Sequence, residues 1–436
     1  MADPKQIARR IFRETLAGID IPFAFERRVV RDGTRIWVDD WSCDLKSFSD
    51  VRVVATGKAT HALLQGFAEL FPELKFTGVA SAPTPPKQEI PGIKYFVGGH
   101  PLPNEDSILA AQTALKQLRT TTQKSLVIFL LSGGGSALME APLGPTIALE
   151  DIRATNKLLV TCGASIDEIN CIRKHASAIK GGRLAVASAK AMKLTLAISD
   201  VPQGKESALA SGPTIPDPTT SADALQIIAR HNLSAKFPAK AREWFNSPAI
   251  PETPKEADPA FANSHFSLLL TSHDLFHAAH HAAESEGFIT CCDNSTDDWP
   301  LEKAVDFLLG QLEELRRMNP GQRVALISDG EVSSKVTGQG IGGRNSAFVL
   351  ACVEKIAGQP IAVLSAGTDG IDGNSPAAGA VADGTTLARA KALRLSPGDF
   401  LARSDSHSFF HHLGDSIVTG PTGNNLRDLR ILLALP

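Results

Sequence analysis

The segment Lys124-Ser-Leu-Val-Ile-Phe-Leu-Leu131 runs directly into Ser132-Gly-Gly-Gly-Ser136. A continuous apolar run of this length is typical of a strand that is buried on both faces of a parallel sheet. Consecutive glycines let backbone N–H groups converge on an anion without obstruction from a Cβ atom. The segment therefore predicts a buried strand that ends in a phosphate-binding turn, made of Ser132, Gly133, Gly134, Gly135 and Ser136.

Two other interpretations of this turn are a flexible connection without function and a nucleophilic serine. The nucleophile elbow of hydrolases requires a glycine after its serine. Ser136 is followed by Ala137-Leu138 and lacks that glycine. We therefore favour phosphate binding.

Short apolar runs and longer helical patterns alternate on both sides of this segment. Further strands are predicted at residues 51–55, 194–198, 267–270, 324–327 and 361–364. Helical patterns cover residues 107–118, 149–162, 301–316 and 345–356. Such alternation predicts an α/β fold with largely parallel sheets.

The chain has 436 residues, which favours two domains. A stretch rich in proline and charge, with no clear period, covers residues 237–259. We place an N-terminal domain over 1–240 and a C-terminal domain over 260–436, and this partition could be discontinuous.

Composition excludes several classes of protein. A formal net charge of −3 argues against a nucleic-acid-binding surface. No apolar run reaches the roughly 18 residues that a membrane helix needs. The six cysteines form no Cys-x-x-Cys pair, and the N-terminus does not resemble a signal peptide. We expect a cytoplasmic protein without a membrane partner, whose oligomeric state the sequence leaves open.

Polar residues follow two of the predicted strands in the first half. Lys58 comes directly after strand 51–55, in Thr56-Gly-Lys, where it can reach an anion at a helix start or remain a solvated lysine. The spacing is not that of a Walker A loop. Asp200 follows strand 194–198 and can hold Mg²⁺, accept a proton from a hydroxyl or serve as an ordinary turn residue.

A basic segment lies between these strands. Asn170, Arg173 and Lys174 share one face of a predicted helix, and Lys180 precedes a pair of glycines. This face can meet a carboxylate or phosphate, or it can be a solvated helix end. We predict Arg173 and Lys180 as substrate-binding residues.

The second half contains a glycine-rich loop and a pair of aspartates. Residues 337–345 read Thr-Gly-Gln-Gly-Ile-Gly-Gly-Arg-Asn and open a helix, which predicts a second anion site. Its predicted phosphate-binding residues are Gly340, Gly342, Gly343 and Asn345, with Arg344 neutralising the transferred phosphoryl group. Asp369 and Asp372 follow strand 361–364 and are predicted metal ligands, for Mg²⁺.

Four histidines lie on one predicted helix after residue 270. They are His273, His277, His280 and His281. Their i, i+4 spacing is compatible with metal binding, but no His-Glu-x-x-His motif is present. We interpret the segment as a surface helix.

The motifs, taken together, resemble those of the class II glycerate 2-kinases, the family whose C-terminal part is called the MOFRL domain. The resemblance covers nearly the whole chain. The N-terminal motifs that carry it are Gly57-Lys-Ala59, Gly98-Gly-His-Pro-Leu-Pro103, Leu131-Ser-Gly-Gly-Gly-Ser-Ala137, Lys180-Gly-Gly-Arg-Leu184, Ser199-Asp-Val-Pro202 and Ser211-Gly-Pro-Thr214. The C-terminal motifs are Gly342-Gly-Arg-Asn345, Gly367-Thr-Asp-Gly-Ile-Asp-Gly373 and Thr419-Gly-Pro-Thr-Gly423.

The resemblance implies ATP-dependent phosphorylation of D-glycerate to 2-phosphoglycerate. It implies a Rossmann-like α/β/α N-terminal domain, a smaller α/β C-terminal domain, and an active site in the cleft between them. Lys58 and Arg344 match the cations regarded as essential in the family. Members have also been labelled hydroxypyruvate reductases.

The chain departs from the family pattern at several positions. Asp329 stands where the family usually has Gly, Ile341 where it has Arg, and Gln203 where it has Gly. Ser346-Ala347 replaces Gln-Glu. Two alternatives to the kinase are an NAD(P)-dependent hydroxypyruvate reductase and a catalytically impaired relative that binds a metabolite.

Overall fold

The computed structural model describes residues 3–144, 146–201, 204–247, 250–424 and 426–436. The chain forms two compact units. One comprises Ile21–Leu269, and the other combines Met1–Asp20 with Leu270–Pro436. The boundary predicted at residues 240–260 falls inside the first of these units. No helix of the described residues is long and apolar enough to cross a membrane.

The unit Ile21–Leu269 is built around a sheet that we call the parallel sheet. Its strands are β4 (Asp50–Thr56), β5 (Thr77–Ala82), β6 (Ile93–Val97), β7 (Ser125–Leu131), β8 (Met192–Ile198) and β9 (Ser264–Leu270). A small antiparallel sheet precedes it, formed by β1 (Val29–Asp32), β2 (Arg35–Val38) and β3 (Trp41–Asp44). The helices of this unit are α2 (Ile21–Arg28), α3 (Thr60–Leu70), α4 (Glu105–Leu118), α5 (Gly135–Leu138), α6 (Leu149–Thr161), α7 (Ile166–Ala176), α8 (Arg183–Ala187), α9 (Ser221–Arg230) and α10 (Ala239–Phe245).

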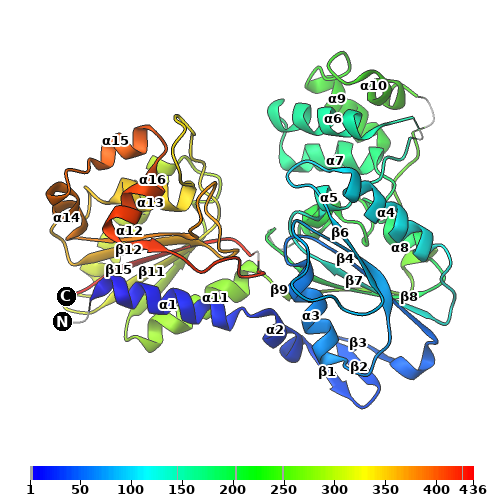
Figure 1. Cartoon of the computed structure of the whole chain (residues 1–436), viewed down its shortest axis with the longest axis horizontal. Helices are drawn as coiled ribbons and strands as arrows, with labels where there is room; N and C mark the ends of the chain where they lie inside the picture. The colour runs from blue at the N-terminus through cyan, green and yellow to red at the C-terminus, as the bar shows by residue number, and fades with distance from the viewer. Residues whose placement is uncertain (1–2, 145, 202–203, 248–249, 425) are drawn as a thin grey trace. The chain divides into compact units, whose positions relative to one another are not determined.

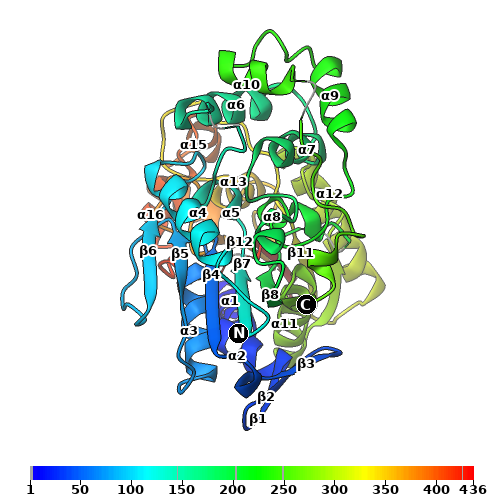
Figure 2. The same ribbon diagram turned by 90° about the vertical axis from the view of Figure 1, so that its right-hand side faces the viewer.

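The strand order of the parallel sheet is β6-β5-β4-β7-β8-β9, and its first five members lie side by side in Figure 2. Pairing from β6 to β8 is parallel throughout. This is the 3-2-1-4-5-6 order of a Rossmann fold, so the expected architecture is confirmed. Every residue of β7 is buried, as the apolar run 124–131 predicts.

The second unit contains a mixed sheet. Its strands are β10 (Ile289–Asp293), β11 (Val324–Asp329), β12 (Ile361–Gly367), β13 (Gly379–Asp383), β14 (Ser416–Ile417) and β15 (Asp428–Ala434). Its helices are α1 (Pro4–Gly18), α11 (Ser272–Ser285), α12 (Leu301–Met318), α13 (Arg344–Cys352), α14 (Thr386–Ala392), α15 (Pro397–Ala402) and α16 (Ser406–Leu413). Helices α1 and α11 cover one face of the sheet, and α12 and α13 cover the other (Figure 1).

The expectation of largely parallel strands is wrong for the mixed sheet. Its order is β10-β11-β15-β12-β13-β14, and only β10 and β11 pair in parallel. The last strand of the chain, β15, inserts between β11 and β12 and runs against both. Helices cover both faces of this sheet, so its antiparallel strands β11, β12 and β15 are buried throughout, and their apolar runs do not differ from those of parallel strands.

Candidate active site

The topology of the parallel sheet brings three of the predicted loops to one edge. Thr56 of β4 pairs with Leu131 of β7, and Leu131 pairs with Ala197 of β8. The loops after these strands carry Lys58, the turn Ser132–Ser136 and Asp200. Strand order reverses between β4 and β7, which is where open α/β sheets bind ligands.

The β4 and β7 loops are hydrogen-bonded to each other. The N–H of Lys58 donates to the carbonyl of Gly133 at 2.9 Å, and the N–H of Ser132 donates to the carbonyl of Thr56 at 3.1 Å. The Ser132 hydroxyl accepts the N–H of Ala59 at 3.0 Å. Lys58 is half-buried, and its Cγ lies 3.3 Å from the point where a Cβ of residue 134 would stand. The structure thus joins Lys58 and the glycine turn in one site.

The glycine turn presents backbone donors. Within the described part of the chain, the N–H groups of Gly133, Gly134 and Ser136 donate to no protein acceptor. Gly134 has a φ of +83°, a left-handed conformation that glycine adopts without strain. Donors of this kind, next to a lysine, suit an anion such as a phosphate.

Gly57 sets the close approach of the two loops, and a prediction follows from it. Its φ is +131°, and an added Cβ would lie 2.6 Å from the carbonyl oxygen of Ser132. We expect Gly57→Ala to lower the free energy of unfolding by about 2–4 kcal/mol, because overlap with Ser132 adds to backbone strain. Gly163 is the control: its φ is +83° and nothing lies within 4 Å, so Gly163→Ala should cost only about 1 kcal/mol. Equal losses in urea denaturation would contradict this packing role.

Sequence reasoning missed the hydroxyl chain behind the turn. Ser136 Oγ lies 2.6 Å from Ser211 Oγ, and the Ser211 hydroxyl donates to Asn170 Oδ1 at 3.1 Å. Ser211 and its neighbour Ala210 have positive φ angles of 58° and 49°. Non-glycine residues in this region are uncommon and are often found at functional sites. The motif Ser211-Gly-Pro-Thr214 was a sequence signal for this position.

The Lys180 side chain is held by protein groups beside the glycine turn. Its side chain is 1% exposed, and Nζ donates to the Ser136 carbonyl at 2.9 Å and forms an ion pair with Glu140. Burial lowers the pKa of Lys180, and the Glu140 carboxylate opposes this change. The ammonium group is enclosed by protein, so substrate binding by Lys180 stays a prediction that these contacts do not favour.

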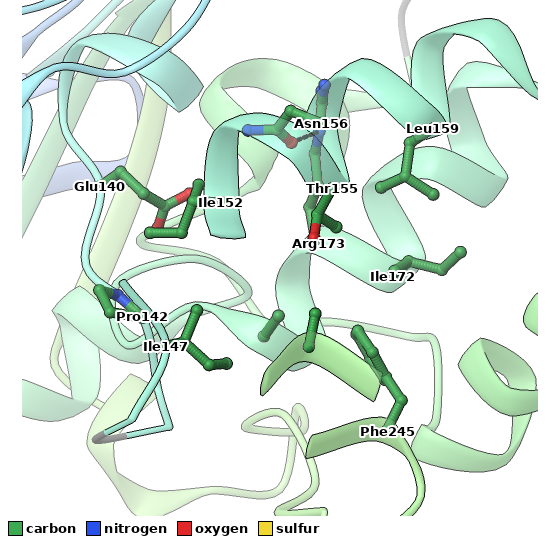
Figure 3. A pocket seen from close by; sticks show the side chains of 12 residues that line it. Glu140, Pro142, Ile147, Ile152, Thr155, Asn156, Leu159, Ile172, Arg173 and Phe245 are labelled. Atoms are coloured by element: carbon green, nitrogen blue, oxygen red, sulfur yellow. Dashed lines mark hydrogen bonds between the residues drawn. The ribbon is translucent and has the colours of Figure 1, made fainter. Parts of the chain in front are cut away.

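Arg173 lies in the wall of a cavity among helices (Figure 3). Its Nε donates to Asn156 Oδ1 at 2.9 Å. The cavity measures about 30 Å³ and is lined mainly by apolar side chains, which leaves room for roughly one water molecule. The structure therefore does not support substrate binding by Arg173 at this cavity.

The second candidate cation, Arg344, begins α13 in the other unit. Its Nε donates to Asp428 Oδ2 at 2.5 Å and its Nη1 to Glu331 Oε2 at 2.6 Å. Burial lowers the pKa of Arg344, but these two carboxylates outweigh burial and raise it above the ordinary value. Asp428 is buried, whereas the Glu331 side chain is 49% exposed. Asp428 was not predicted, because it lies 84 residues from Arg344.

Asp372 caps helix α13. Its Oδ1 accepts the N–H of Asn345, and its Oδ2 accepts both the N–H and the hydroxyl of Ser346, at 2.9, 2.9 and 2.6 Å. Burial raises the pKa of Asp372, and these hydrogen bonds oppose that change. The carboxylate thus anchors a helix start, and its role as a metal ligand stays a prediction that these bonds do not favour.

The glycine loop before Arg344 is tied to its own unit. The N–H groups of Gly340 and Gly342 donate to the carbonyl of Arg403 and to Asn374 Oδ1, at 3.2 and 2.8 Å. The N–H of Gly343 donates to Ser346 Oγ at 3.3 Å, and Asn345 Oδ1 accepts the Ser365 hydroxyl at 2.6 Å. The loop is packed by protein, unlike the turn at Gly133, so phosphate binding by these residues remains only a prediction.

Asp200 and Asp369 are half-buried carboxylates at strand ends, each with some solvent access. Asp369 Oδ1 accepts the N–H of Ile371 at 3.0 Å. Across the described ranges, no cluster of three or more His, Cys, Asp or Glu side chains is arranged to hold a metal ion. Pro202 and Gln203, next to Asp200 in sequence, lie outside the described residues.

Asp329 is the residue that replaces the family's glycine. It is 0% exposed, and among the described residues neither carboxylate oxygen has a hydrogen-bond partner. Its nearest cation is Arg427, with Nη1 3.8 Å from Oδ2. Burial raises the pKa of Asp329 to about 6, although Arg427 opposes this change. The carboxyl group therefore titrates close to neutral pH.

This pKa predicts a pH-dependent stability. The buried carboxyl group is more stable in its neutral form, so its contribution to folding stability is complete below the unfolded pKa of 3.8. That contribution is lost as pH rises through the folded pKa of about 6. The difference between these two pKa values corresponds to about 3 kcal/mol in the free energy of unfolding. We expect Asp329→Asn to remove it, so that the thermal midpoint falls less between pH 5 and pH 8 than in the unmodified protein. An identical fall in both proteins would show that Asp329 is charged at both pH values.

The fold and the loops define a class: α/β proteins with a Rossmann sheet whose switch-point loops present a lysine and backbone N–H donors. The model of a domain of unknown function, DUF4147, matches residues 7–246, and the MOFRL family model matches residues 324–428. D-glycerate 2-kinase of Thermotoga maritima is 33% identical, with 87% of this chain and 90% of that protein aligned. A relative in Agrobacterium vitis, provisionally named hydroxypyruvate reductase, is 35% identical over 87% of this chain and 86% of its own.

A solved structure supports the same family assignment. A crystal structure of glycerate kinase from Thermotoga maritima superposes with a TM-score of 0.84 at 31% identity, covering 99% of both chains. The chain belongs to the MOFRL-domain glycerate 2-kinase family.

Proposed function

We propose that the protein transfers the γ-phosphoryl group of ATP, with Mg²⁺, to the 2-hydroxyl of D-glycerate. The observation that carries this proposal is the pairing of Lys58 with the glycine turn, in which the N–H groups of Gly133, Gly134 and Ser136 have no acceptor among the described residues. Family membership adds the substrate and the reaction, since the relatives bear the name glycerate kinase.

Each residue has a physical task in this proposal. Lys58 and the Gly133–Ser136 turn bind and orient phosphoryl oxygens, and Arg344 contributes a second positive charge. Ser211 positions the Ser136 hydroxyl, and Lys180 supports the turn by donating a hydrogen bond to the Ser136 carbonyl. Phosphoryl transfer depends on positioning and charge neutralisation more than on covalent help, so no nucleophilic side chain is required.

Asp200 is the carboxylate we propose for orienting the glycerate hydroxyl and accepting its proton. It follows β8, next to the strand that leads into the glycine turn. Mg²⁺ would neutralise phosphate charge when bound, and it is usually held by one or two carboxylates together with substrate oxygens. Half-buried Asp200 and Asp369 fit that requirement.

The reductase alternative lacks structural support. In a dinucleotide-binding Rossmann fold, the Gly-x-Gly-x-x-Gly turn follows the first strand. The corresponding strand here is β4, and it leads into Thr56-Gly-Lys-Ala-Thr60, with a single glycine.

Three measurements on the purified protein separate the three candidate functions. Purified protein is incubated with Mg-ATP and D-glycerate, and the product is identified by phosphorus NMR. The kinase predicts ADP and 2-phosphoglycerate, with L-glycerate as the control substrate. NADH oxidation with hydroxypyruvate and no ATP requirement would favour the reductase. Glycerate binding without turnover would favour the impaired relative.

A further inference from the structure

Outside the proposed kinase site, a cysteine, a histidine and a glutamate contact one another in the mixed-sheet unit. Cys292 on β10 has its Sγ 3.6 Å from His280 Nδ1 on α11. His280 Nε2 lies 3.2 Å from Glu284 Oε1, one helical turn further along α11. Cys292 is exposed at the edge strand of the sheet, so the group is accessible from solvent.

Glu284 sets which nitrogen of His280 carries the proton. A carboxylate accepts only from N–H, so neutral His280 is protonated at Nε2 and its Nδ1 lone pair faces the thiol. Metal-binding histidines commonly show this arrangement, with the second ring nitrogen donating to a carboxylate. Glu284 is also in the last turn of α11, where the helix dipole favours a cation.

The sulfur–nitrogen distance fits a shared metal ion. Zinc at about 2.3 Å from sulfur and 2.0–2.1 Å from nitrogen, with a tetrahedral angle, places the two atoms about 3.5–3.6 Å apart. We propose that Cys292 and His280 bind Zn²⁺ as a two-ligand surface site, with Glu284 orienting the imidazole and water completing the tetrahedron. With two protein ligands the site is weaker than the three- and four-ligand zinc sites of structural zinc proteins.

Binding requires the thiol to lose its proton. Forming the Zn–S bond releases the thiol proton to solvent. Zinc affinity should rise with pH in consequence.

Cys291 provides a matched control. It is also exposed, but neighbouring residues of a strand point to opposite faces. Its Sγ contacts the Cys292 carbonyl at 3.9 Å, not the imidazole. If a thiol bound the metal without His280, replacing Cys291 and replacing Cys292 would have the same effect on metal binding.

Cobalt titration of the reduced full-length protein tests the proposal without reference to kinase activity. Co²⁺ bound to a thiolate gives a near-ultraviolet charge-transfer band, which Zn²⁺ should abolish by displacement. We expect the band in the unmodified protein and in Cys291→Ser, but not in Cys292→Ser. His280→Gln and Glu284→Gln should each weaken cobalt affinity about tenfold or more. A band that persists in Cys292→Ser, or that His280→Gln leaves unchanged, would overturn the site. Circular dichroism of each variant confirms folding.

Discussion

Replacing Lys58 with alanine is expected to lower kcat/KM for ATP and glycerate by about 10³-fold, the loss typical of removing one electrostatic contact to a transition state. The lysine follows β4 at the switch point and lies against a turn in which three N–H groups, those of Gly133, Gly134 and Ser136, have no protein acceptor among the described residues. Without the ammonium group, this side of the proposed site would have only the turn's backbone donors to stabilise the charge of the transferred phosphoryl group.

Lys124→Ala is the matched control for Lys58→Ala. Lys124 is exposed directly before β7, at the opposite end of the strand from the glycine turn. Steady-state kinetics of both variants, with circular dichroism to confirm folding, decide the question. Wild-type turnover in Lys58→Ala would remove this residue from the proposed site.

Arg344→Ala is expected to reduce turnover by about 10³-fold or more, as loss of an arginine does in other phosphoryl transfers. Arg344→Lys should recover little, because a lysine cannot keep the separate bonds that Nε makes to Asp428 and Nη1 makes to Glu331. Activity near the wild-type rate in either variant would contradict the role.

For Arg344→Ala, a loss of folding stability must be distinguished from a loss of catalysis. Arg344→Ala leaves the buried Asp428 carboxylate without its closest cation, which should cost about 1–3 kcal/mol because Arg344 itself is partly exposed. The double variant Arg344→Ala/Asp428→Asn removes that charge. We expect it to regain stability in urea denaturation while remaining inactive. Arg317→Ala, at an exposed position of α12, is the surface control.

The first half of the candidate site followed from local sequence. Lys58, Ser132–Ser136 and Asp200 each come after a predicted strand, and carboxyl ends of parallel strands necessarily share one edge. Predicting the strands therefore also predicted that these loops are neighbours. The substrate-binding roles of Arg173 and Lys180 stay predictions. Spacing on a helix shows which side chains share a face, but not whether that face meets ligand or protein.

The sequence did not predict contacts between charged groups that are distant along the chain. Glu140 for Lys180, Asp372 for helix α13 and Asp428 for Arg344 lie 40, 26 and 84 residues from the groups they contact. Each buried charge needs a partner, but residue type alone does not say which carboxylate is brought close. The position of β15 between β11 and β12 decided the last of these.

The amino-acid sequence by itself determined the alternation of strands and helices, the loops that carry charge, and the family, because burial patterns and glycine turns are properties of neighbouring residues. Tertiary structure alone decided which charged side chains have solvent access and which are paired with other side chains inside the protein. It also placed Cys292 beside His280. The charge pairings depend on contacts between segments far apart in the chain, which leave no local pattern. Cys292 and His280, only 12 residues apart, meet because β10 packs against α11.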